Sequence, residues 1–387
     1  MPHRPLHILF SVPAYWPAVA FGGPIWVARD LGEGLAARGH RVEVMTTSLV
    51  DLQRGRSMRT RSKEIGGVRV HYLATPLRYR WMGLVPSLPL ALARIGRPDV
   101  VHVFGYRDPV GLGVSAWSKA RRIPYLLEPM GMFRPRVRKQ RLKGVFDPLL
   151  PRPLARGASL VVATSSLERD DLAEGGLDRG RIAVRPNPFP PVRAGRTGAL
   201  RRRLGLGDEP LVLYVGRIAG GKGIELLLEA MRGLPDTHVA LVGPGGHAAV
   251  AAQVAVEAAS DALRGRVHVV PPWSDERPLE IYGDADVLVL ASTGRNENFG
   301  LVAAEAVAAG TPVVVSDQTG IAELVAGRAG IVVPPTAGAV REALGRILGD
   351  EEVRDRLRSA TAALAEEHSA GTLVERQESL YRSVLER

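Results

Sequence analysis

The stretch of residues 286–315 constrains the fold of this chain more than any other part of the sequence. Residues 286–291 form a short run rich in Val and Leu, which is typical of a buried parallel strand. A polar loop follows at residues 292–298. Residues 300–309 have the composition of a helix, which Gly310 and Pro312 end. The next strand is predicted at residues 313–315, so this β-α-β order indicates a parallel sheet of the α/β class.

The chemistry predicted for this stretch lies at the loop and the first turn of the helix. A helix N-terminus presents unpaired backbone N–H groups and partial positive charge, which attract phosphate. Gly300 allows the backbone to approach an anion closely. Two carboxylates, Glu297 and Glu305, flank the turn. The alternative is that both are solvated acidic residues, because a Glu pair at this spacing is common by chance.

Together these residues resemble the signature of the family-4 retaining glycosyltransferases, of the glycosyltransferase group 1 type, which have the GT-B fold. The resemblance implies that Glu297 faces the donor sugar and that Glu305 holds the nucleotide ribose. It also implies that the amides of Gly300 and Leu301 hold the diphosphate, with Asn298 and Phe299 in the same substrate-binding loop. The matching residues are Glu297, Phe299, Gly300, Glu305, Ala306, Ala308, Gly310 and Pro312.

A second glycine loop opens the C-terminal half of the chain. A strand predicted at residues 210–215 leads into the loop at 216–223, and a helix is predicted at 224–231. Lys222 is a compact ammonium in a glycine loop before a helix, which suits a phosphate, although the Walker A spacing is missing. The segment resembles the family's Gly-Arg-x4-Lys-Gly pattern, which implies Arg217 and Lys222 on the donor diphosphate. Gly216 and Gly243, each following a predicted strand, join the substrate-binding set.

The N-terminal half offers two further candidate positions. Gly22 and Gly23 follow a strand predicted at residues 7–12 and precede a predicted helix, and they resemble the family's donor or acceptor loop. The alternative is that they only shape a turn. We place His102 at the C-terminal end of the strand within residues 98–105, where ligands bind in open α/β sheets. It resembles the family's histidine that contacts the donor sugar near the reacting carbon; otherwise it is structural.

Length and linker composition predict two domains. Residues 188–198 contain three prolines and lack periodicity, so we place the linker there. We expect an acceptor-side Rossmann-like domain at residues 1–190 and a nucleotide-sugar-binding one at 191–365, facing it across a cleft. The resemblance implies that a C-terminal helix, residues 366–387, packs back on the first domain. Residues 54–63 are polar and basic and are predicted to form a loop.

Charge and composition limit the partners. The formal net charge of +11 favours an anionic partner such as a sugar nucleotide, a phosphorylated lipid or a membrane surface. The basic run at residues 134–143 is either a solvated helix or a surface for acceptor or membrane. No motif for nucleic acid is present. Without cysteine there is no disulfide or thiolate metal site. Asp284 and Asp286 match a metal-binding Asp-x-Asp pattern, which we interpret as chance.

The location of the protein is predicted from its N-terminal segment. Residues 6–28 are nearly uncharged, but their prolines and glycines would break a membrane helix. A strand followed by a glycine loop explains them better than a signal peptide does. We therefore expect a cytoplasmic protein, with peripheral contact at the inner membrane face as a further option.

The expected function is retaining transfer of a hexose-type sugar from a nucleoside-diphosphate sugar to a hydroxyl acceptor. The acceptor is expected to be a lipid-linked or polysaccharide glycan. Arg217 and Lys222 would stabilise the departing diphosphate, Glu297 and His102 would position the sugar, and no cofactor or metal is expected. Three alternatives stay open: glycosylation of a small-molecule natural product, a sugar-nucleotide 2-epimerase, and a non-catalytic sugar-nucleotide-binding protein.

Overall fold

A computed structural model describes residues 4–51, 56–57, 61–79, 81–133, 151–192, 195–245, 248–273, 279–294 and 297–386. The chain forms two compact units. Unit 1 comprises Met1–Pro186 and Ala370–Arg387, and unit 2 comprises Asn187–Ser369. The basic run at residues 134–143 lies outside the described residues. None of the helices in the described part of the chain is long and apolar enough to cross a membrane.

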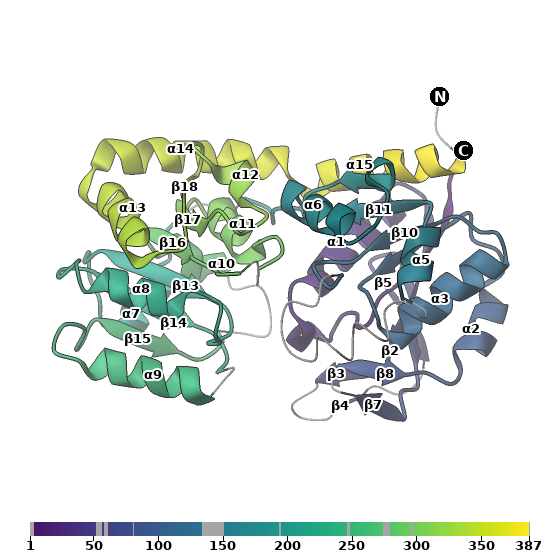
Figure 1. Ribbon diagram of the computed structural model, residues 1–387, viewed down its shortest axis with the longest axis horizontal. Helices are drawn as coiled ribbons and strands as arrows, with labels where there is room; N and C mark the ends of the chain where they lie inside the picture. Colours follow the sequence, from purple (N-terminus) through teal and green to yellow (C-terminus); the bar gives the residue numbers. More distant parts are fainter. Residues whose placement is uncertain are drawn as a thin grey trace. The chain divides into compact units, whose positions relative to one another are not determined.

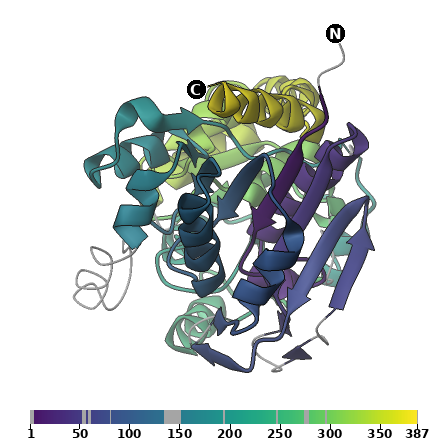
Figure 2. The same cartoon turned by 90° about the vertical axis from the view of Figure 1, so that its right-hand side faces the viewer.

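Unit 1 is built on a sheet with the strand order β12-β11-β10-β9-β1-β2-β6-β5 (Figures 1 and 2). Its strands pair in parallel except for β5, which runs antiparallel to β6 at one edge. Two short hairpins, β3–β4 and β7–β8, lie outside this sheet. The strands of unit 1 are β1 (His7–Ser11), β2 (Arg41–Thr47), β3 (Leu49–Asp51), β4 (Arg56–Ser57), β5 (Arg61–Ile65), β6 (Val68–Leu73), β7 (Leu77–Tyr79), β8 (Met82–Leu84), β9 (Val100–Phe104), β10 (Tyr125–Glu128), β11 (Leu160–Ala163) and β12 (Ile182–Val184).

Helices cover both faces of this sheet, and alternate residues of each strand enter one of two buried clusters. Helices α1 and α15 contribute to the cluster on one face. Helices α2, α3, α5 and α6 contribute to the cluster on the other face. The helices of unit 1 are η1 (Val19–Phe21), α1 (Pro24–Ala37), α2 (Leu88–Ile95), α3 (Pro109–Ala120), α5 (Pro151–Gly157), α6 (Ser166–Glu174), η2 (Arg179–Arg181) and α15 (Ala370–Leu385).

The C-terminal helix α15 belongs to unit 1, although the helix before it, α14, belongs to unit 2. Figure 1 shows α15 running along unit 1 in yellow. Gly34 of α1 gives α15 its close approach, because a Cβ at that position would lie 2.4 Å from a methyl group of Val374. Arg38, the C-cap residue of α1, also donates to Glu378 of α15 at 2.9 Å. The chain therefore returns to its first unit through its last helix, as predicted.

Unit 2 is built on a wholly parallel sheet with the order β15-β14-β13-β16-β17-β18. Renumbered within the unit this is 3-2-1-4-5-6, the order of dinucleotide-binding sheets. The strands are β13 (Leu211–Val215), β14 (His238–Val242), β15 (Val267–Val270), β16 (Val287–Leu290), β17 (Val313–Ser316) and β18 (Gly330–Val333). The helices are α7 (Ala199–Leu204), α8 (Ile224–Met231), α9 (Ala248–Ala259), α10 (Leu279–Gly283), α11 (Leu301–Ala308), α12 (Ala322–Val325), α13 (Ala337–Gly349) and α14 (Glu351–Glu367).

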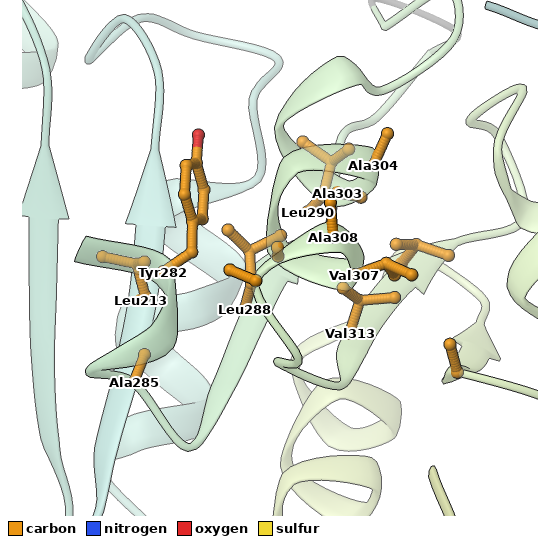
Figure 3. Packing of buried hydrophobic residues seen from close by; sticks show 14 of the residues in the cluster. Leu213, Tyr282, Ala285, Leu288, Leu290, Ala303, Ala304, Val307, Ala308 and Val313 are labelled. Carbon is orange, nitrogen blue, oxygen red and sulfur yellow. The ribbon is translucent and has the colours of Figure 1, made fainter. Parts of the chain in front are cut away.

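The core of unit 2 explains why α11 sits tightly on its sheet. Figure 3 shows Ala303, Ala304 and Ala308 of α11 among the Leu and Val side chains of β16 and β17. Small side chains on the buried face bring the helix backbone close to the strands, which fixes the position of its N-terminus. The opposite face of the sheet is covered by α8, α9 and α13.

One predicted segment differs from the structure. Residues 54–63 were expected to form a loop, and residues 54–55 and 58–60 of this segment lie outside the described residues. Of the others, Arg56–Ser57 forms β4 and Arg61–Ile65 forms the edge strand β5. Edge strands commonly carry charged residues, which protect an exposed ladder from pairing with another chain. The basic residues of β5 fit this edge position.

Candidate active site

The strand order of unit 2 reverses between β13 and β16, and ligands of open α/β sheets bind beyond the carboxyl ends of the strands at such a point. The loop after β13 carries Gly216, Arg217 and Lys222. The loop after β16 carries Glu297, Asn298 and Gly300. The fold thus brings two predicted loops, about 75 residues apart in sequence, to the same point of one unit.

The two glycine loops approach other backbone segments too closely for a side chain. A Cβ at Gly223 would lie 2.0 Å from the carbonyl oxygen of Ala291, which directly follows β16. A Cβ at Gly243 would lie 2.1 Å from the carbonyl oxygen of Gly216. The N–H of Thr293 donates to the carbonyl of Gly221 at 3.1 Å. These contacts hold the loops after β13, β14 and β16 together as one surface.

Lys222 and Glu297 form an ion pair across this surface. The Lys222 Nζ lies 2.7 Å from Glu297 Oε2, and the two side chains are 19% and 22% exposed. Both charges are therefore partly shielded and still open to a ligand. Arg217 lies in the same loop as Lys222 and is exposed, while its carbonyl accepts a hydrogen bond of 2.8 Å from the buried Tyr214 hydroxyl. Burial raises the pKa of Tyr214, and Glu297 raises it further, so this hydroxyl keeps its proton.

The turn before α11 is held by backbone hydrogen bonds and by a glycine in the left-handed conformation. Gly300 is the N-cap of α11 and adopts a φ of 102°, in the left-handed region that favours glycine. The carbonyls of Asn298 and Phe299 accept from the N–H groups of Gly320 and Ile321 at 3.0 and 2.7 Å. The Phe299 side chain is buried in the core of unit 2. It anchors the turn, so the amides beyond Gly300, including that of the half-buried Leu301, are what the turn offers to a ligand.

Glu305 lies further along α11 and is partly buried. Its Oε2 accepts a hydrogen bond from the hydroxyl of Tyr282, a fully buried residue of α10. Figure 3 shows the Tyr282 ring standing beside the core of the sheet with its hydroxyl toward the end where α11 begins. The sequence prediction named Glu305 but missed Tyr282, because nothing in a lone Tyr of a short helix marks it as a partner of a carboxylate.

The two carboxylates of the Asp-x-Asp match have internal partners in unit 2. Asp284 accepts from the backbone N–H groups of Gly198 and Leu200 at 2.6 and 2.7 Å. Asp286 accepts from Arg201 at 2.8 Å and from the N–H of Leu211 at 2.9 Å. These bonds tie the start of unit 2 to its sheet. They give both residues a structural role, in keeping with the interpretation of the match as chance.

The glycines of unit 1 lie at the start of α1. Gly22 adopts a φ of 89° and donates its N–H to the carbonyl of Val19, and Gly23 is the N-cap that precedes Pro24. Nothing lies within 4 Å of a Cβ built on Gly22, so its conformation rather than its surroundings favours glycine there. In the structure these glycines form a turn that precedes a helix. Such a turn is needed whether the glycines contact a ligand or only shape the chain.

His102 differs from its predicted position. It is the third of the five residues of β9, not its C-terminal end, and its side chain is entirely buried. Its Nδ1 lies 2.8 Å from the Tyr381 hydroxyl of α15, and its Nε2 lies 3.3 Å from Glu128 Oε2. Phe104 stacks on the imidazole ring. With every atom enclosed, this side chain is placed to hold α15 rather than to meet a sugar.

His102 belongs to a buried polar network in unit 1. Glu128 and Arg185, which form an ion pair, and Tyr381 are all buried around it. Burial lowers the pKa of His102, although the hydrogen bond to Glu128 offsets part of this effect. Burial would raise the pKa of Glu128, but the charge of Arg185 and the His102 hydrogen bond hold it below its usual range. The sequence signal that could have predicted this network is Glu128, an acidic residue in the otherwise apolar strand β10.

Two family models match the chain. The model for glycosyl transferases group 1 matches residues 197–363, and a glycosyl transferase 4-like domain matches residues 22–188. The D-inositol 3-phosphate glycosyltransferase of Xylanimonas cellulosilytica is 32% identical over 375 residues, which cover 88% of this chain and 87% of that protein. The alpha-D-kanosaminyltransferase of Streptomyces kanamyceticus is 34% identical over 198 residues, covering 49% of this chain and 50% of that protein.

Solved structures share the architecture of this chain. HepE of Anabaena, in complex with UDP and glucose, has a TM-score of 0.75 and 19% identity over 98% of this chain and 100% of that one. Sucrose-phosphate synthase of Thermosynechococcus elongatus has a TM-score of 0.74 and 24% identity over 97% of this chain and 98% of that one. At such identities the likeness shows the fold alone.

Proposed function

Because this chain belongs to the family of group 1 glycosyl transferases and has the GT-B fold, we propose that it moves a hexose-type sugar from a nucleoside-diphosphate sugar to a hydroxyl acceptor with retention of configuration. The observation that carries the proposal is the Lys222–Glu297 ion pair beside the N-terminus of α11, at the point where the strand order of unit 2 reverses. A cation, a carboxylate and a helix N-terminus together suit a sugar diphosphate.

The proposed chemistry starts with the bond between the anomeric carbon and the diphosphate. As this bond breaks, negative charge develops on the leaving diphosphate oxygen. Arg217, Lys222 and the amides at the start of α11 supply fixed positive potential for that charge. The acceptor hydroxyl forms the new bond on the same face of the sugar, and its proton passes to the departing phosphate oxygen. Glu297 positions the sugar, and Glu305 holds the ribose of the donor.

We further propose that the reaction needs no metal ion. The support is that Arg217, Lys222 and the N-terminus of α11 can supply the positive potential that a metal ion would otherwise bring to a diphosphate. His102 is left out of this catalytic set because its side chain is enclosed in the network of unit 1.

The donor and the acceptor are proposed from two further observations. HepE was solved with UDP and with UDP-glucose, so we propose UDP-glucose as the first donor to test. The acceptor is proposed to be anionic, because unit 1 carries 33 Lys and Arg against 17 Asp and Glu, a formal charge of +16, whereas unit 2 carries 18 against 23, a charge of −5. A lipid-linked glycan with phosphate fits this charge, as does a phosphorylated polyol such as the one named for the Xylanimonas relative.

We also propose that the protein acts in the cytoplasm, in peripheral contact with the anionic inner face of the membrane. The support is the same concentration of positive charge in unit 1.

Calorimetric titration with UDP, GDP, ADP and TDP and their common sugars, in the presence of EDTA, tests the donor part of this proposal. We expect selective binding of one nucleotide and its loss in Lys222→Ala. Equal affinity of the wild type and this variant for every nucleotide would contradict the site. Transfer assays with a phosphorylated polyol and with a lipid-linked glycan, run in parallel, then identify the acceptor class.

A further inference from the structure

The hairpin β7–β8 of unit 1 presents an apolar face to solvent. Leu77 pairs with Leu84, and Tyr79 pairs with Met82. In an antiparallel ladder paired residues point to the same side, and so do residues two apart on one strand. These four side chains therefore share one face. Leu77, Tyr79 and Leu84 on this face are 66%, 53% and 48% exposed.

The other face of the hairpin is the one that packs on the protein. Gly83 is buried there, and a Cβ on it would lie 2.4 Å from Thr75, 3.1 Å from Thr47 and 3.3 Å from Leu49. Figure 1 shows β7 and β8 beside β3 at one end of unit 1. The hairpin thus inverts the usual pattern, because its small residue faces the protein and its large apolar residues face outward.

The segment of sequence that carries this face is basic. Residues 65–98 contain five Arg residues and no Asp or Glu. Arg78 on β7 pairs with Gly83, so it belongs to the opposite face of the hairpin, but it is exposed. Arg94 on α2 is also exposed, as is the apolar Leu90 of α2, at 58%. Trp81, in the turn of the hairpin, is partly exposed. Apolar and aromatic side chains together with Arg are typical of protein surfaces that bind a membrane interface. There the aromatic rings lie among the lipid head groups and Arg pairs with phosphate.

We propose that the apolar face of the β7–β8 hairpin inserts into the surface of an anionic membrane. The charge of unit 1, +16 by its sequence, favours an anionic lipid surface and opposes a second copy of the same unit. The four apolar residues are enough for interfacial contact and not for spanning. This inference rests on the membrane contact proposed above and gives it a surface, but it does not depend on sugar transfer.

Co-sedimentation of the full chain with vesicles tests the inference. The vesicles are phosphatidylcholine alone, or phosphatidylcholine with a third of phosphatidylglycerol, at low and high salt. We expect binding to the anionic vesicles only, weakened by salt. The double variant Leu77→Ser, Leu84→Ser should bind about tenfold more weakly, because two exposed Leu side chains lose their burial in lipid. Arg78→Gln should weaken binding to a smaller extent.

A matched control comes from unit 2. Val256 on α9 is 72% exposed, so Val256→Ser removes an equally exposed apolar side chain from an acidic unit and should bind as the wild type does. Brominated lipids should quench fluorescence in the wild type and much less in Trp81→Phe.

Three results would overturn the inference: no binding to anionic vesicles, unchanged binding of the double variant, or a dimer in sedimentation equilibrium that the double variant abolishes. The last would assign the face to a second copy of the chain. Nucleotide binding by the double variant should match that of the wild type, so failure of this inference is distinguishable from failure of the proposed sugar transfer.

Discussion

Lys222 and Glu297 are two residues that the sequence suggested for separate tasks, and the structure places them 2.7 Å apart. A lysine paired in this way is held at the end of its loop, and the carboxylate is held beside α11. Each therefore positions the other, and loss of either leaves its partner without its counter-charge.

Lys222→Ala should lower kcat/KM by about 100-fold or more, because fixed positive charge at the leaving group is lost. Glu297→Gln should also lower it by about 100-fold, because the carboxylate that positions the sugar and pairs with Lys222 is lost. Steady-state kinetics with the preferred donor measures this, and circular dichroism checks that both variants fold. Arg328 is a matched control, because it forms an exposed ion pair of 2.8 Å with Glu367 in the same unit. Arg328→Ala should keep the wild-type rate, and an equal loss in that variant would point to general destabilisation.

Tyr282 is predicted to act through Glu305. Tyr282→Phe removes the hydroxyl that donates to Glu305 and should weaken nucleoside-diphosphate binding by about threefold to tenfold, the value of one hydrogen bond. The measurement is calorimetric titration with a ribonucleotide and its 2′,3′-dideoxy analogue. The loss should appear with the ribonucleotide and be small with the analogue. An equal loss with both would mean that Tyr282 only supports the fold.

The proposal that sugar transfer needs no metal ion also rests on single residues. If Arg217, Lys222 and the α11 amides neutralise the diphosphate, EDTA should leave the initial transfer rate within about twofold of that in Mg²⁺. Inactivation by EDTA, with recovery on addition of a divalent cation, would contradict this assignment.

At the scale of elements, α15 is fixed to unit 1 by a buried hydrogen bond between Tyr381 and His102. Because burial lowers the pKa of His102 from 6.5, the folded protein holds this imidazole neutral where the unfolded chain would protonate it. The unfolded state then binds more protons below pH 6.5. The stability from this site is present above that pH and is lost as the pH falls toward the folded pKa.

The variant His102→Gln tests this direction of the pH dependence of stability. The difference in Tm between wild type and variant should shrink as the pH falls from 7.5 to 5, because only the wild type has an imidazole to protonate. Burial raises the pKa of Asp108 to about 6, and this group contributes in the opposite sense, but it is common to both proteins and cancels in the difference. A difference that does not change with pH would show that His102 does not titrate in this range.

Element types and their order were largely predictable, and the contacts between elements were not. The apolar run before Gly216 and the glycine after it predicted β13 and its loop. The contact of Gly223 with Ala291, however, depends on two strands being neighbours in space. His102 was misplaced because a polar residue in an apolar strand resembles a site residue. Its partners, Glu128 and Tyr381, lie 26 and 279 positions away along the chain.

The β7–β8 hairpin was missed for a related reason. Its residues lie in a segment that proline interrupts, and its alternation of apolar residues has the usual appearance of a half-buried strand. Only the packing of Gly83 shows that the apolar face is the outer one.

At the scale of the whole molecule, the proposed donor site lies within unit 2, whose sheet is covered on both faces by its own helices. A unit with its own core can fold alone. Residues 187–369 expressed by themselves should therefore bind the preferred nucleotide with a Kd within about tenfold of that of the full chain. A folded fragment that binds no nucleotide would show that unit 1 supplies part of the donor site.

The uneven charge of the two units fits a division of tasks, with the basic unit 1 meeting an anionic acceptor or membrane and unit 2 holding the donor. The release of nucleoside diphosphate from UDP-, GDP-, ADP- and TDP-sugars, in the presence of candidate acceptors, tests the central claim most directly. The account predicts that the wild type consumes one of these donors and that Lys222→Ala consumes it about 100-fold more slowly. Equal rates for the two proteins, or no turnover of any donor, would contradict it.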